Sequence, residues 1–245
     1  PVQPAQPPPT VYVYELPPPP SYAQHAPPPP PPAPPKRAKR QGVHTHDGFY
    51  LRLGIGAAAL AVSNERRSES DLTLSTGGGA FEFGMGGTIG DGFVLGGRVI
   101  AVGGANLELE TPADRTEVPG SLGYATVQLF ADWYLDPESG LHIEGALGPA
   151  GLTYDPTGDQ RHSEELEGDE VELEGFGGSL GIGLEGWVSE QWSLGGLLRL
   201  NWATFDGNLG TGADTPLLSA NGDGDGDTGT VIAVAPMLML TGTFH

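Results

Sequence analysis

Residues 230–244 read TVIAVAPMLMLTGTF, and their alternation decides the fold. One face is apolar and ends near an aromatic residue, whereas the other carries small or adaptable side chains such as Met237 and Met239. The stretch is long for a soluble strand, but a tilted strand crosses a bilayer with ~9–11 residues. If the rest of the chain repeats this pattern, it forms a membrane β-barrel. The apolar face consists of Ile232, Val234, Pro236, Leu238, Leu240, Gly242 and Phe244.

Composition divides the chain and narrows its partners. The 245 residues include 40 glycines, 24 prolines and no cysteine, and the net charge is −20. The absence of cysteine excludes disulfides, thiolate catalysis and cysteine–metal sites. Residues 1–46 hold four of the 11 basic residues and one of the 31 acidic ones, so the remainder carries seven basic against 30 acidic residues. This excess of acidic residues after residue 46 argues against nucleic-acid binding, which needs Lys and Arg to contact phosphates.

Proline is concentrated in the first 35 residues, and we predict a boundary near residue 46. Residues 1–46 are expected to form a polyproline II-like, semi-rigid tail without regular structure. Within it, residues 11–14 (VYVY) could add to a partner's sheet edge, and the basic run 36–40 (KRAKR) could contact polyanions. Residues 47–245 are expected to form the barrel.

From residue 47 the hydrophobic period is two, which is the period of a strand. No stretch approaches ~18 consecutive apolar residues, so no transmembrane helix is predicted. Long connections are expected at 63–78, 110–120, 155–174 and 206–229, and short turns at the opposite end. Outer-membrane barrels segregate their loops in this way. The eight predicted strands are 48–62, 79–89, 93–109, 121–135, 141–154, 175–188, 192–205 and 230–244.

Aromatic residues gather at the strand ends, as in the girdles that flank a membrane barrel. We predict one girdle beside the short turns, from Phe93, Trp133, Trp192 and Phe244. A second girdle, near the long loops, is predicted from Tyr124, Phe176 and Trp202.

Residues 47–245 resemble the small eight-stranded outer-membrane barrels of the outer-membrane protein A transmembrane domain and protein X type. Strand number, loop rhythm and the near-terminal Phe244, here followed by His245, carry this resemblance. It implies an all-β, antiparallel up-and-down transmembrane barrel in a bacterial outer membrane. Lipids, lipopolysaccharide and the outer-membrane assembly machinery are the implied partners. An even strand number puts both ends at the short turns, so the tail is expected in the periplasm, beside a periplasmic or peptidoglycan partner.

The polar face of the strands is expected to line the lumen. An eight-stranded barrel is just wide enough for side chains to fill. Buried charges must be paired, so we predict ion pairs centred on the two arginines. The alternative is a narrow, acid-lined, cation-preferring pore. The predicted network contains Glu82, Arg98, Glu108, Asp132, Glu144, Glu185 and Arg199.

No cofactor is expected, except for a weak surface Ca²⁺ site. Oxygen ligands recur at every second position in Asn221, Asp223, Asp225 and Asp227, but the run lacks the glutamate that an EF-hand requires at position twelve. Residues 162–164 (HSE) cannot readily form a catalytic triad because they are adjacent in sequence.

The sequence therefore favours a non-enzymatic envelope protein. Its expected role is anchoring or interaction, with acidic outer loops and a lumen closed by ion pairs. A narrow channel is the alternative, and a soluble lipocalin-like binder is a second alternative, since alternation alone does not exclude it.

Overall fold

The computed structural model describes residues 14–15, 46, 48–64, 72–90, 92–136, 139–156, 171–209, 218–220 and 229–245. The chain divides into two units, residues 1–39 and 40–245. The strands are β1 (Phe49–Asn64), β2 (Thr73–Gly90), β3 (Phe93–Glu110), β4 (Arg115–Tyr134), β5 (Leu141–Asp155), β6 (Val171–Trp187), β7 (Trp192–Leu209), β8 (Leu218–Ala220) and β9 (Thr230–Phe244).

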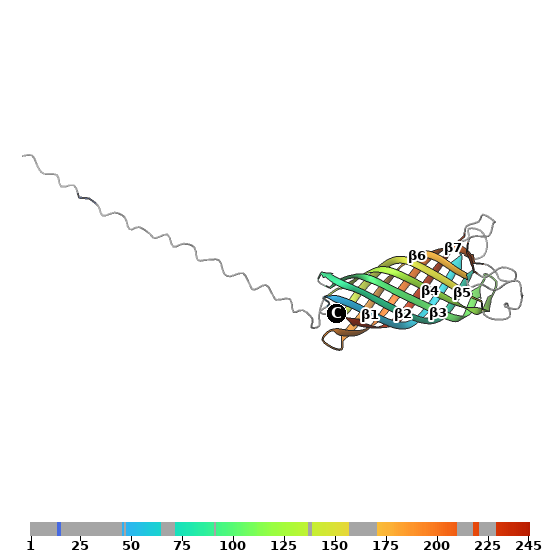
Figure 1. Ribbon diagram of the computed structural model, residues 1–245, viewed down its shortest axis with the longest axis horizontal. Helices are drawn as coiled ribbons and strands as arrows, with labels where there is room; N and C mark the ends of the chain where they lie inside the picture. The colour runs from blue at the N-terminus through green and yellow to red at the C-terminus, as the bar shows by residue number, and fades with distance from the viewer. Residues whose placement is uncertain are drawn as a thin grey trace, which may run out of the picture. The chain divides into compact units, whose positions relative to one another are not determined.

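Eight of these strands form one closed antiparallel ring (Figure 1). Each strand from β1 to β7 pairs with the next, and β9 pairs with both β7 and β1. Among the described residues, the short β8 pairs with the far end of β7 alone. The prediction of an eight-stranded antiparallel barrel is thus confirmed. Among the described residues, no helix is long and apolar enough to cross a membrane.

The seam between β1 and β9 closes the ring and contains the stretch 230–244. Leu51 pairs with Phe244, and Asn64 pairs with Val231. Pairing is interrupted opposite Pro236 but resumes in the same register. Because proline has no backbone N–H, a missing ladder bond without a bulge is the expected consequence.

Loop lengths follow the predicted alternation except after β3. There the sequence predicted a long loop over 110–120, but β4 begins at Arg115 and residues 111–114 form a tight turn. In this turn, the Thr111 amide donates to the Asp114 carbonyl over 2.9 Å. At the opposite end, the turn between β2 and β3 uses Gly92 at φ 71°, which glycine adopts without steric cost.

The outer surface carries a continuous apolar band. The outward side chains of its strands are large, aliphatic or aromatic, and well exposed, reaching 78% at Leu129. Water-soluble proteins bury such side chains, whereas a membrane barrel presents them to lipid. The band includes Ile55, Phe81, Val99, Leu129, Leu147, Leu180, Leu198 and Leu240.

The interior has two sections of opposite character. At the end where β1 begins, charged and polar side chains fill it. Toward the other end, the interior is apolar, although the sequence predicted a polar lumen throughout. There the alternation places leucine and aromatic side chains inside and acids such as Glu172 and Asp206 outside. The apolar section includes Leu60, Leu74, Leu107, Leu122, Leu152, Phe205 and Val231.

Candidate functional site

Three arginines and four carboxylates meet inside the barrel in the polar section. Each of these residues is at most 7% exposed. The strands place them there because each occupies the inward parity of its strand, between outward apolar neighbours. We call this set the lumen network: Arg52, Glu82, Arg98, Asp132, Glu144, Glu185 and Arg199.

Glu144 lies at the centre of the lumen network and contacts all three arginines. Its Oε2 accepts from Nη1 of Arg52 over 2.7 Å. Its Oε1 accepts from Nη1 of Arg98 over 2.8 Å and from Nε of Arg199 over 2.5 Å. Arg199 also reaches Glu82 Oε2 at 2.9 Å. Charge-assisted bonds of this length are the strong ones, and they compensate the loss of hydration on burial.

Arg52 extends the network toward the end of the barrel where β1 begins. Its Nη2 donates to Asp132 Oδ2 over 2.7 Å and lies 3.3 Å from Glu185 Oε1. The same Glu185 oxygen accepts from the Thr243 hydroxyl over 2.8 Å. Nδ1 of His142 lies 2.7 Å from Asp132 Oδ1.

Every strand of the ring contributes to this polar cluster. Seven strands supply a charged member each, with Arg52 on β1, Glu82 on β2 and Arg98 on β3 as the first three. Thr243 adds a hydroxyl from β9. The cluster therefore ties the whole circumference together across the lumen.

Six of the seven residues predicted for the network lie in it, but Glu108 does not. Glu108 faces outward, with a 47% exposed side chain 3.4 Å from Arg115. The cause is a register irregularity in β3 between Ala105 and Leu107, where Asn106 adopts φ 62°. The additional residue reverses the alternation, so Leu107 points inward and the prediction for Glu108 is wrong.

Sequence reasoning missed Arg52. Its signal was present, since Tyr50 and Arg52 alternate with the outward Leu51 and Leu53 on the first strand.

The predicted girdle residues lie on the outer surface, with the exception of Tyr124. Trp133 and Trp192 are 48% and 39% exposed, and Phe93 is partly exposed. The Phe244 ring lies 5.5 Å from Trp192, centroid to centroid. Trp202 is also partly exposed, on β7. Tyr124, however, is 2% exposed and points inward, because the alternation of β4 places even-numbered residues inside.

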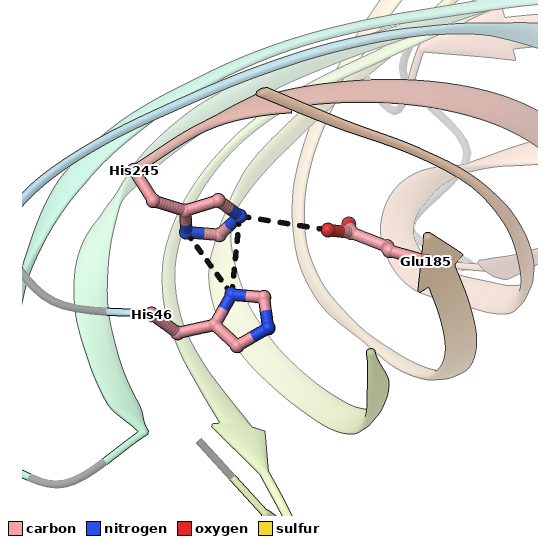
Figure 2. Close-up of side chains that lie close together, drawn as sticks. All are labelled: His46, Glu185 and His245. Atoms are coloured by element: carbon pink, nitrogen blue, oxygen red, sulfur yellow. Dashed lines mark hydrogen bonds and ion pairs between the residues drawn. The ribbon is translucent and has the colours of Figure 1, made fainter. Parts of the chain in front are cut away.

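Two histidines and a carboxylate meet at the end of the lumen where β1 begins (Figure 2). We call His46, Glu185 and His245 the mouth cluster. Nδ1 of His46 lies 3.1 Å from Nε2 of His245, which is 3.6 Å from Glu185 Oε2. All three residues are buried, and one ligand atom from each lies within 4.8 Å of the others. His46 precedes β1 and His245 follows β9.

His46 is held in one orientation. Its Nε2 lies 3.0 Å from the Ser139 carbonyl, which can only accept, so Nε2 donates. Its ring stacks on Tyr134 at a centroid distance of 3.5 Å. Burial lowers the pKa of His46 to about 3, and the neighbouring His245 adds to this shift. At neutral pH the ring is therefore neutral, with the Nδ1 lone pair directed at His245.

The predicted Ca²⁺ run at 221–227 and the run 162–164 lie outside the described residues. Both remain sequence-based expectations.

No family model and no curated protein matches the chain. Solved structures similar to it include the outer membrane protein OprG from Pseudomonas aeruginosa, at 13% identity and TM-score 0.46, covering 83% of this chain and 99% of OprG. Neisserial surface protein A is 14% identical, with a TM-score of 0.49, and the match covers 80% of this chain and 96% of that protein. Ail from Yersinia pestis is 12% identical, with a TM-score of 0.42, and the match covers 80% of this chain and 99% of Ail. At such identities, the likeness concerns architecture alone.

Proposed function

We propose that this chain is a bacterial outer-membrane barrel that anchors or organises the cell envelope and does not conduct solutes. The supporting observation is the filled interior, in which the lumen network occupies one section and apolar side chains occupy the other. On this proposal the tail lies in the periplasm and reaches a periplasmic or peptidoglycan partner. The acidic outer loops hold divalent cations that bridge lipopolysaccharide phosphates.

The apolar band supports placement in a bilayer. A closed ring leaves no unpaired strand edge, which is the condition for a β-structure in lipid. Exposed acids lie at the end opposite the network, on Glu172, Glu174 and Asp206. This division suits a barrel that crosses a membrane with one section and projects into water with the other.

Replacing Leu129 by arginine tests that placement. Leu129 lies in the middle of the outward apolar run of β4 and is 78% exposed. An arginine on the lipid face near the bilayer midplane costs about 2–4 kcal/mol. We expect the free energy of unfolding in lipid vesicles, measured by urea titration, to fall by that amount. The exposed Thr204→Arg on the projecting section serves as control, and equal, small effects of both variants would support a soluble barrel.

The apolar section is the main argument for occlusion. A cation that passed the network would next meet Leu60, Leu107 and Phe205, each at most 1% exposed. Apolar constrictions block ions by excluding water. A narrow cation pore is nevertheless the second candidate, because four carboxylates exceed three arginines in the network.

Single-channel recording in planar bilayers separates these two functions. We expect the purified barrel to show no reproducible conductance steps, whereas a general porin in the same bilayers conducts. Arg98→Ser, which removes a guanidinium from the network, should remain silent because the apolar section is intact. Cation-selective steps in the parent chain that change in Arg98→Ser would establish the pore instead.

A further inference from the structure

We infer that the mouth cluster is a binding site for a divalent transition-metal ion of the zinc class. Two imidazoles and one carboxylate form a donor set that suits zinc. Hard ions such as Ca²⁺ and Mg²⁺ prefer all-oxygen sites, so they fit this set poorly. The inference is independent of the envelope role proposed above.

Two of the three donor separations are close to those around a tetrahedral ion. Donor atoms at about 2.0–2.1 Å from a tetrahedral zinc lie ~3.3 Å from one another. The separations are 3.1 Å between Nδ1 of His46 and Nε2 of His245 and 3.6 Å between that Nε2 and Glu185 Oε2, and the three residues offer ligand atoms within 4.8 Å of one another. Small side-chain shifts would therefore bring the three donors around one ion (Figure 2).

The surroundings of the cluster orient its donors. His46 donates its other ring nitrogen to the Ser139 carbonyl, which leaves Nδ1 free of a proton. Ser193 donates to Glu185 Oε2 over 2.6 Å. Metal-ligating histidines and carboxylates are held by second contacts of these kinds.

The ion would link three separate parts of the barrel. His46 lies before β1, Glu185 on β6 and His245 after β9. Such a link fastens the approach to the first strand and the end of the last strand to β6, which is separated from β9 by β7. Because three protein donors leave one position of a tetrahedral ion open, water or a small anion completes it.

Zinc titration of the folded, untagged chain in detergent tests the inference. With a chromogenic competing chelator, we expect uptake of one ion per chain. His46→Ala and His245→Ala should each weaken affinity by more than about tenfold, since even residues that only orient ligands account for 10–100-fold. Co²⁺ substituted for zinc should give the visible spectrum of a tetrahedral ion.

Two matched variants assign the uptake to this cluster. His162→Ala removes a histidine elsewhere in the sequence, and Glu82→Gln removes a network carboxylate that contacts Arg199 rather than the histidines. Both should retain zinc affinity, whereas Glu185→Gln should lose it. Folding of each variant is checked by its heat-dependent shift on a gel.

Three results would overturn the inference. The first is no uptake by the parent chain, which would make the cluster a hydrogen-bonded cap only. The second is that the parent chain and folded His46→Ala bind zinc with equal affinity. The third is that His162→Ala loses as much zinc affinity as His46→Ala. His46 lies outside the strands, so its replacement is expected to fold. If His245→Ala does not fold, comparing the zinc affinity of the parent chain with that of His46→Ala still tests the inference.

Discussion

Replacing Glu144 by glutamine is expected to lower the free energy of unfolding by about 3–5 kcal/mol, the typical cost of removing one partner from a buried ion pair. Glu144 contacts Arg52, Arg98 and Arg199 at once. Glutamine retains the volume and an acceptor oxygen but not the charge, so three guanidinium groups lose a shared counter-ion. Urea titration in lipid vesicles, followed by the gel shift of the folded barrel, measures the effect.

Glu174→Gln is the matched control, because Glu174 is exposed on β6 and its replacement should change the free energy of unfolding little.

A second test removes the positive charge that Glu144→Gln leaves without a counter-ion. Arg98→Met in the Glu144→Gln background should recover part of the lost stability, because the two residues interact directly. Equal unfolding midpoints for Glu144→Gln and the parent chain would show that the network contributes nothing to stability.

Replacing Phe205 by alanine is expected to cost about 3–5 kcal/mol through the cavity it leaves in the apolar section. Phe205 is 1% exposed and belongs to the interior apolar cluster. Its ring occupies the space beside Gly175, where an added Cβ would lie only 2.6 Å from Cδ1. The lost burial of the ring and the incomplete collapse of the barrel wall into the cavity both lower the free energy of unfolding.

Thr204→Ala, on the exposed side of the same strand, should stay within about 0.5 kcal/mol of the parent chain. If Phe205→Ala unfolds at the same urea concentration as Thr204→Ala, the apolar section is loosely packed. The occlusion argument would then lose its main support.

The barrel could be predicted because strand alternation is a local property of the sequence. The stretch 230–244 forms β9 with the predicted bounds, and its apolar parity faces outward. Alternation fails where one residue interrupts it. At Asn106 the period slips by one, and the sequence holds no proline or glycine at that position to indicate the slip. The prediction for Glu108 therefore names the wrong face.

The mouth cluster could not have been predicted by this reasoning. His46 and His245 lie just outside the strands, where alternation gives no orientation. They are 199 residues apart and meet only because the ring closes between β9 and β1. Glu185 was predicted to face the lumen, but its height along the barrel depends on the stagger of every strand pair in between.

The contacts of Arg52 have a consequence for how the barrel forms. Its acidic partners lie 80, 92 and 133 residues further along the chain. None is on a strand next to β1, whose partners among the described strands are β2 and β9. A partly assembled sheet would hold this guanidinium without its counter-ions, and such an intermediate is costly in lipid. Insertion and closure should consequently proceed as one cooperative step, with the rate limited by contacts distant in sequence.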